Sequence, residues 1–151
     1  MEFARNKCGL DGAHSTEIEP ETKHPVVTIL KEQEELIRKK QYGGSMRLGA
    51  WTAVLKPGST ISKAYGNRAE VSERHRHRYE VNPEYISALE KAGLVIAGKS
   101  KEGGLVEYIE LAGHPYFVAT QSHPEFKSRP EQAAPLFVGL ARAAVERRSR
   151  Q

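Results

Sequence analysis

The chain has 151 residues, 38% of them hydrophobic and 28% charged, a composition that allows one globular core and excludes a disordered tail. No run approaches the roughly 18 apolar residues of a membrane helix, and the start of the chain lacks the apolar stretch of a signal peptide, so we expect no membrane partner and a cytoplasmic location. The net charge of +4 is modest and gives only weak support to nucleic-acid binding.

The predicted elements begin with a short helix, a loop and a strand. Residues 2–7 form the helix, and Gly9 suits its C-terminal cap. Because this helix is short and has no capping residue before it, we interpret it as the end of an element that begins further upstream. Residues 11–24 are polar and predict an ordered loop, and the β-branched run at residues 26–30 predicts a strand.

The middle of the chain predicts one long strand between charged and turn-forming segments. Residues 31–40 are strongly charged and predict either a short exposed helix or a mobile loop, which a glycine pair at residues 43–44 ends. Residues 46–55 are predicted as a strand that finishes in a Pro-Gly turn at residues 56–59. Residues 61–65 are predicted to continue as a short helix or an edge strand.

The second half predicts strands around one helix and a second helix at the end. Residues 76–81 form a strand, and Asn82 and Pro83 suit the N-cap and the first position of a helix. Three further strands and a terminal helix follow at residues 94–97, 105–111, 116–120 and 133–146. Strands mixed with two or three helices, without repeats or an internal linker, indicate a single α/β domain over residues 1–151.

The first candidate site is the segment QSHPEF at residues 121–126, which follows an apolar strand. Catalytic groups gather at the carboxyl ends of strands in open α/β sheets. Pro124 disfavours helical geometry at His123 and predicts an extended segment, in which His123 and Glu125 point the same way. A carboxylate beside an imidazole holds one tautomer and stabilises the charged form, as in a nucleophile–His–acid triad. The alternative is a surface histidine near a glutamate.

The second candidate is the basic run ERHRHRYEVN at residues 73–82. On a strand its three arginines face one way and its two histidines the other, and an arginine fork suits an anionic substrate. His75 and His77 are two potential metal ligands without a third, so no metal site is predicted. Nucleic-acid contact would need more interleaved aromatic residues than Tyr79. Composition alone favours a solvated, ion-paired strand.

Cys8, the only cysteine, is the obvious candidate for a nucleophile, and we argue against that role. It lies at the carboxyl end of the first predicted helix, where the helix dipole does not stabilise a thiolate. It also lacks the sharp strand-to-helix turn that exposes a nucleophile. We therefore predict that Cys8→Ser leaves any activity unchanged. A single cysteine forms no internal disulfide, which fits a reducing compartment.

Several segments, in order along the chain, resemble the CTP synthase family. They are EFARN at residues 2–6, GAHSTE at 12–17, GGSMRLG at 43–49, LKPG at 55–58, KAYG at 63–66, ERHRHRYEVN at 73–82, LVE at 105–107 and QSHPEF at 121–126. The run at residues 73–82 and the MRLG motif are specific to CTP synthases. The His-Pro-Glu segment is shared across class I glutamine amidotransferases.

The resemblance implies a fold of the α/β class, part of a flavodoxin-like class I glutamine amidotransferase domain with a mixed sheet and flanking helices. In that family a synthetase domain makes CTP from UTP with ATP and Mg²⁺. The amidotransferase domain hydrolyses L-glutamine and sends ammonia to it. The full-length family is homo-oligomeric. This chain itself is expected to bind no cofactor.

The resemblance also assigns roles to four residues of this sequence. His123 matches the general base and acid, and Glu125 matches its orienting carboxylate. Glu17 matches a residue that contacts the bound glutamine. Arg78 matches the arginine that holds the α-carboxylate of the substrate, which gives a role to one arginine of the basic run.

The chain departs from the family in what precedes residues 2–6. There the family has its nucleophilic cysteine, its glycine-rich oxyanion loop and the synthetase domain, and this sequence contains none of them. Without the nucleophile and the oxyanion donors the covalent route is lost. We therefore expect an N-terminal part to be missing and the isolated chain to be inactive. We also expect it to expose an apolar surface, with the missing amidotransferase portion and the synthetase domain as partners.

Two other functions remain open. A module derived from an amidotransferase could hold glutamine through Glu17 and Arg78, or dock on a full-length enzyme, without chemistry. Binding of glutamine without turnover would indicate such a regulatory module. A basic nucleic-acid binder predicts strongly salt-dependent binding, and we rank this function last.

Overall fold

The computed structural model describes residues 1–30 and 46–150, and the chain divides into two compact units. The first unit comprises Met1–Leu48 and Arg76–Leu94, and the second comprises Gly49–His75 and Val95–Gln151. Each unit has its own β-sheet. The predictions for residues 31–40 and for the glycine pair at 43–44 lie outside the described residues.

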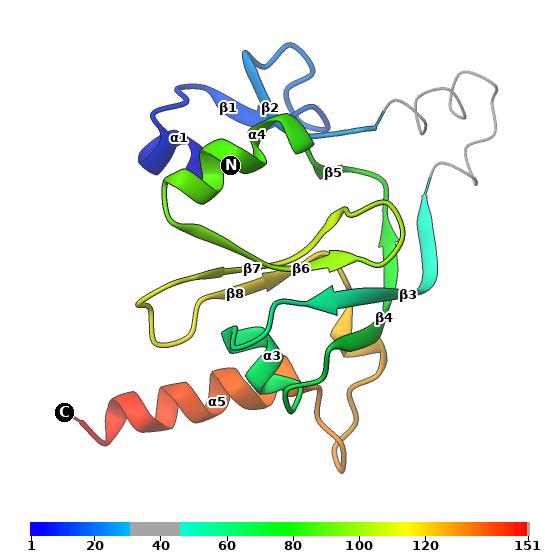
Figure 1. Ribbon diagram of the computed structural model, residues 1–151, viewed down its shortest axis with the longest axis vertical. Helices are drawn as coiled ribbons and strands as arrows, with labels where there is room; N and C mark the ends of the chain where they lie inside the picture. Colours follow the sequence, from blue (N-terminus) through cyan, green and yellow to red (C-terminus); the bar gives the residue numbers. More distant parts are fainter. Residues whose placement is uncertain (31–45, 151) are drawn as a thin grey trace. The chain divides into compact units, whose positions relative to one another are not determined.

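Among its described residues, 1–30, 46–48 and 76–94, the first unit contains a three-stranded sheet and two helices (Figure 1). Its elements are α1 (Glu2–Cys8), β1 (Ala13–Ser15), β2 (His24–Thr28), β5 (Glu80–Val81) and α4 (Pro83–Lys91). Strand β2 is central, parallel to β1 and antiparallel to β5. Gly9 ends α1 with a φ of 66°, a left-handed conformation that glycine adopts without strain. The side chain of Asn82 caps α4 by accepting a hydrogen bond from the N–H of Glu84 at 3.0 Å.

The second unit contains a five-stranded sheet and the remaining helices (Figure 1). Its elements are β3 (Arg47–Leu55), α3 (Thr60–Ala64), β4 (Glu70–His77), β6 (Leu94–Ser100), β7 (Val106–Leu111), β8 (Val118–Thr120), the 3₁₀ helix η2 (Pro124–Phe126) and α5 (Pro135–Arg148). The strand order is β4-β3-β6-β7-β8, and β6 runs antiparallel to β3, as β8 does to β7. The chain passes from one unit to the other within β3, β4 and β6.

The core of the second unit joins the sheet to α3 and α5. Ile61 of α3 is fully buried, and its backbone N–H donates a hydrogen bond of 3.1 Å to Oε2 of Glu110 on β7. The hydroxyl of Ser59 accepts a hydrogen bond from the N–H of Ser62, which caps the same short helix. The core residues are Ala53, Leu55, Ile61, Tyr65, Val71, Ala97, Tyr108 and Leu136.

The strand predicted at residues 76–81 is wrong in both position and continuity. Strand β4 begins six residues earlier, at Glu70, and ends at His77. Every second residue from Val71 to His75 is buried, so the strand follows a period-two pattern that its charged residues conceal. After β4 ends, Glu80–Val81 pairs with β2 in the other sheet, because the backbone of this short segment finds its hydrogen-bond partners there.

The loop predicted at residues 11–24 also needs correction. It contains strand β1 at Ala13–Ser15, which pairs in parallel with β2, and His24 is the first residue of β2. Ala13 and Ser15 are buried. The partners of a parallel strand are set by tertiary structure, so a polar three-residue strand carries little local signal.

The other predicted elements are confirmed with small shifts of their ends. The opening helix, the strand before the Pro-Gly turn and the helix after Asn82 occur where predicted. The segment predicted at residues 61–65 forms the helix α3 (Thr60–Ala64) rather than an edge strand. The terminal helix starts at Pro135, at the first helical position where proline costs no hydrogen bond.

Helix α5 exposes much of its apolar surface within the described residues. Leu136 is buried in the core, whereas Leu140 and Val145 are 57% and 65% exposed. Phe137 and Val138 are also exposed. The apolar residues of α5 therefore pack into the core only at its first turn, and the others form an exposed apolar surface. None of the helices in the described ranges is both long and apolar enough to cross a membrane.

Candidate active site

His123 and Glu125 form a hydrogen-bonded pair just after strand β8. Nδ1 of His123 lies 2.6 Å from Oε1 of Glu125, which confirms the predicted approach of the two side chains. The side chains are 34% and 51% exposed. A ligand in solution can therefore reach the imidazole while the carboxylate holds it.

The extended conformation predicted for this segment is wrong beyond His123. The φ of His123 is −111° and its ψ is 78°, but Pro124–Phe126 then form the 3₁₀ helix η2. Pro124 restricts only the residue before it, and its own fixed φ suits the first position of a helical turn. The ring of Phe126 stacks on the His123 ring at 5.2 Å between centroids and 19° between planes, so the turn also orients the imidazole.

The pairing determines which nitrogen of His123 can act on a substrate. A carboxylate oxygen accepts hydrogen bonds, so Nδ1 carries the proton that it donates to Glu125. Nε2 is then the nitrogen that can accept a proton from a reacting group. The carboxylate also stabilises the imidazolium that this transfer creates. These are the properties of a general base that becomes a general acid in the next step.

The backbone beside His123 is anchored on both sides. The N–H of Gln121 donates to the carbonyl oxygen of Glu107 on β7 at 3.0 Å, and the N–H of His123 donates to the carbonyl oxygen of Arg74 on β4 at 2.8 Å. Between them, Ser122 is buried and its N–H donates to Oγ1 of Thr120 at 2.9 Å. The segment therefore bridges β7 and β4, two strands that are not neighbours in the sheet.

The two other predicted site residues lie in the first unit. Glu17 is exposed in the turn after β1, and its backbone N–H donates to the hydroxyl of Ser15 at 3.2 Å. Arg78 is half-buried and follows the end of β4. His123 and Glu125 belong to the second unit. The structure thus describes the two pairs of residues in separate units.

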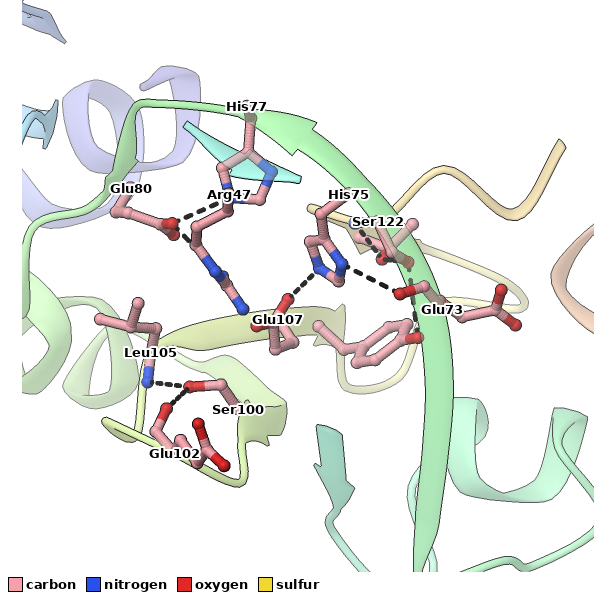
Figure 2. A network of polar contacts seen from close by, with 12 residues as sticks. Arg47, Glu73, His75, His77, Glu80, Ser100, Glu102, Leu105, Glu107 and Ser122 are labelled. Atoms are coloured by element: carbon pink, nitrogen blue, oxygen red, sulfur yellow. Dashed lines mark hydrogen bonds and ion pairs between the residues drawn. The ribbon is translucent and has the colours of Figure 1, made fainter. Parts of the chain in front are cut away.

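Composition alone favoured a solvated strand for the basic run, but its two histidines are largely removed from solvent. In the second unit, Nε2 of His75 lies 2.7 Å from Oε2 of Glu107, and both side chains are almost fully buried. In the first unit, His77 pairs with Glu80 at 2.9 Å, and Arg47 contacts the same carboxylate at 3.3 Å. Figure 2 shows both clusters.

Sequence reasoning missed these clusters, although part of the signal was present. Buried and exposed residues alternate from Val71 to His75, which marks one buried face of β4. The glutamate partner of His75 lies 32 residues away in sequence, a separation that no local pattern covers. On the other face of β4, Arg74 and Arg76 are exposed, as predicted for a strand. Within the described ranges, no three His, Cys, Asp or Glu side chains gather closely enough to hold a metal.

Two buried tyrosines extend the cluster around His75. Burial raises the pKa of Tyr65, and nearby Tyr108 and Glu73 add to the effect. Burial likewise raises the pKa of Tyr108. Both phenols therefore stay protonated at neutral pH, and the Tyr65 hydroxyl donates a hydrogen bond of 3.2 Å to Oε1 of Glu73.

Cys8 lies at the last position of α1 and is half-buried. Its Sγ contacts the carbonyl oxygen of Ala88 in α4 at 3.7 Å. The carboxyl end of a helix offers no positive potential to a thiolate. This environment is that of a structural cysteine.

The comparisons with known proteins agree on one family. The profile of glutamine amidotransferase class-I matches residues 13–143. The CTP synthase of Methanocaldococcus jannaschii is 59% identical over 96% of this chain, and that of Thermus thermophilus is 52% identical over 96%. This chain spans 26% of the length of each. The solved glutaminase domain of Trypanosoma brucei CTPS with bound acivicin aligns with a TM-score of 0.87 and 36% identity, over 96% of this chain and 55% of that one.

The fold similarity and the profile match both extend over most of the described chain, and the His-Pro-Glu segment lies within the matched residues. The chain therefore belongs to the class I glutamine amidotransferase family and corresponds to the glutaminase-domain region of the CTP synthases.

Proposed function

We propose that this chain forms part of the glutamine-hydrolysing site of a CTP synthase, the site that releases ammonia for the amination of UTP to CTP. The observation that carries the proposal is the solvent-accessible His123–Glu125 pair with Nδ1 held at 2.6 Å. The family membership supports it, because the chain matches the glutaminase region of relatives named CTP synthase.

In the proposed reaction a cysteine thiolate attacks the side-chain amide carbon of glutamine, and the C–N bond breaks as ammonia leaves. Nε2 of His123 takes the thiol proton and gives it to the departing nitrogen, and then activates the water that hydrolyses the thioester. Glu125 orients the imidazole throughout. The thiol comes from a part of the enzyme outside this chain, since Cys8 donates to Ala88 within the first unit.

Arg78 and Glu17 are proposed to bind the glutamine that is hydrolysed. The planar guanidinium of Arg78 can donate two parallel hydrogen bonds to the α-carboxylate of the substrate. Glu17 is exposed and contacts the same ligand in this proposal. ATP and Mg²⁺ serve the synthetase chemistry of the whole enzyme, which we expect to be a homo-oligomer, and no residue of this chain is assigned to them.

A hybrid enzyme tests the proposal directly. The matching 145 residues of the Methanocaldococcus jannaschii CTP synthase are replaced by the corresponding segment of this chain, which is 59% identical. We expect the hybrid to form CTP with glutamine as nitrogen donor, and His123→Asn to abolish glutamine use while CTP formation from free ammonia continues. A hybrid that makes CTP from ammonia but never from glutamine would overturn the proposal.

The alternative function is a glutamine-binding module without chemistry, and it is favoured by Glu17 and Arg78 both lying in the first unit, which contains neither His123 nor Glu125. Titration calorimetry of the isolated chain with glutamine separates the two. Binding by the chain, together with a hybrid that does not turn glutamine over, would establish the module. The proposed function instead predicts turnover in the hybrid, whatever the isolated chain binds.

A further inference from the structure

The peptide that carries His123 closes a ring of hydrogen bonds in the second unit. Gln121 is bonded to the backbone of Glu107 at 3.0 Å, and His123 is bonded to the backbone of Arg74 at 2.8 Å. The residue after Arg74 is His75, whose side chain reaches back to the side chain of Glu107. The ring therefore runs from β7 through the segment 121–123 to β4, and returns through one side-chain pair.

That side-chain pair is almost fully buried. Nε2 of His75 lies 2.7 Å from Oε2 of Glu107, with the side chains 2% and 1% exposed. Nδ1 of His75 lies 3.1 Å from the backbone oxygen of Glu73. Figure 2 shows the imidazole of His75 between these two oxygen atoms.

The partners of His75 require a proton in its bond to Glu107. A backbone oxygen only accepts, so Nδ1 of His75 must be the donor to Glu73. Nε2 and the carboxylate of Glu107 would otherwise face each other with two lone pairs at 2.7 Å. The pair therefore shares one proton, either as imidazolium and carboxylate or as imidazole and carboxylic acid. In both forms it is neutral overall, which makes its burial possible.

The pair connects two strands that are not neighbours in the β-sheet. In the strand order β4-β3-β6-β7-β8, two other strands stand between β4 and β7. The two strands on which the His123 peptide is suspended are therefore not joined by a ladder of hydrogen bonds in this sheet. The His75–Glu107 contact joins them directly, at residues adjacent to or identical with the two backbone acceptors.

We propose that His75 and Glu107 are positioning residues for His123, acting through the spacing of β4 and β7 rather than by touching the substrate. This inference rests on the proposed function of His123 as the general base. A displacement of the imidazole by about 1 Å can cost roughly 100-fold in rate, because the proton transfer depends on alignment. The buried pair prevents such a displacement.

Three substitutions separate positioning from general stability. Glu107→Ala breaks the ring, whereas Glu107→Gln keeps it, because a glutamine amide can donate to Nε2 of a neutral His75. Glu110→Ala is the matched control: Glu110 is also a buried glutamate on β7, but it bonds to the N–H of Ile61 in α3 and not to the His123 peptide.

The first readout is the tautomer of the His123 imidazole in the full chain. It is followed in ¹H–¹⁵N spectra of the imidazole nitrogens, which are assigned by comparison with His123→Asn. We expect a single Nδ1–H tautomer in the unchanged protein, in Glu107→Gln and in Glu110→Ala. Glu107→Ala should convert it to a mixture of tautomers. A folded Glu107→Ala with unchanged His123 signals would overturn the proposal, as would an equal change in Glu110→Ala.

If Glu107→Ala does not fold, the double variant His75→Phe with Glu107→Leu decides the matter. Replacing both partners by apolar groups leaves no buried charge unpaired, yet it also removes the polar closure of the ring. Loss of the single His123 tautomer in the folded double variant supports the proposal. Retention of the single tautomer contradicts it.

The second readout is kinetic, in the hybrid enzyme. Glu107→Ala should lower kcat for glutamine by roughly 10- to 100-fold with little change in KM, since a displaced base affects the transition state and not substrate binding. Glu107→Gln should restore most of kcat. A rise in KM alone would contradict a positioning role. An inactive parent hybrid with intact His123 tautomers would count against the proposed function and not against this inference.

Discussion

The second unit contains two histidine–glutamate pairs with nearly equal distances in different surroundings. Nε2 of His75 and Oε2 of Glu107 are 2.7 Å apart with side chains 2% and 1% exposed, whereas His123 and Glu125 are 2.6 Å apart and 34% and 51% exposed. The chemical groups are the same. The partners of the first pair come from strands β4 and β7, and those of the second are two residues apart in one turn.

The difference in burial gives the two histidine–glutamate pairs different roles. A buried pair is screened little by water, so losing one partner leaves an uncompensated polar group in the core. It also has no access to a substrate. An exposed pair contributes only about 0–1 kcal/mol to stability, but its free nitrogen can exchange a proton with a reacting group. The first pair is therefore suited to structure and the second to chemistry.

The largest expected effect is on catalysis, from the exposed pair. His123→Ala in the hybrid enzyme should lower kcat/KM for glutamine by about 10² to 10⁴-fold, the usual contribution of a general base. The same change should alter the unfolding free energy by no more than about 0.5 kcal/mol, because the side chain is partly exposed. Ammonia release and urea unfolding measure the two quantities. A large loss of stability would contradict the expectation that the exposed pair contributes little to the unfolding free energy.

The buried pair should show the opposite balance. Glu107→Ala should lower the unfolding free energy of the chain by about 3–5 kcal/mol, because it removes the carboxylate that Nε2 of the buried His75 contacts. Urea unfolding followed by circular dichroism measures this change. A loss below about 1 kcal/mol would mean that water enters and replaces the carboxylate, and the contrast in burial would then carry no energetic meaning.

A smaller catalytic effect should follow from Glu125→Gln, which keeps the shape of the side chain and removes its charge. We expect kcat for glutamine in the hybrid to fall by about 10- to 100-fold, as for other groups that orient a functional histidine. This loss is smaller than the roughly 10⁴-fold loss at a buried triad aspartate. Glu125 is half-exposed, so water can partly replace its carboxylate. An unchanged kcat would mean that Glu125 does not orient His123 during catalysis.

The smallest effect concerns alkaline pH and the buried cluster beside His75. Burial raises the pKa of Tyr65, so above about pH 10 the unfolded chain loses this proton while the folded chain keeps it. The stability linked to Tyr65 is complete below that pH and is lost as pH rises, by about 1.4 kcal/mol per pH unit. Tyr65→Phe should reduce the slope of unfolding free energy against pH. Equal slopes in both proteins would contradict a raised pKa for Tyr65 in the folded chain.

Local signals explain the elements that could be predicted. Gly9 ends α1 and Asn82 begins α4 because the backbone near each residue needs a specific conformation or acceptor, which the residue itself supplies. The His123–Glu125 contact was predictable for the same reason, since two residues span it. The extended geometry expected beyond His123 failed because Pro124 can also start a helical turn.

Non-local pairing explains what could not be predicted. Strand β1 exists because Ala13–Ser15 lie beside β2, and the break between β4 and β5 exists because Glu80–Val81 pair with β2. The resemblance to CTP synthases supplied the expected role of Arg78, which charge alone left among three arginines. The resemblance supplied no role for His75, because the motif at residues 73–82 contains His75 but not its partner Glu107.

The sequence by itself determined the family, the caps of the helices and the spacing that brings His123 to Glu125. Only the tertiary structure decided which histidine is sealed in the core and which remains open to a ligand. The physical reason is that solvent exposure depends on segments far apart in the chain: His75 is buried because Glu107, 32 residues later, folds against it. Hydrogen bonding between neighbours is a local property of a sequence, whereas the dielectric environment of the bond is a property of the whole fold.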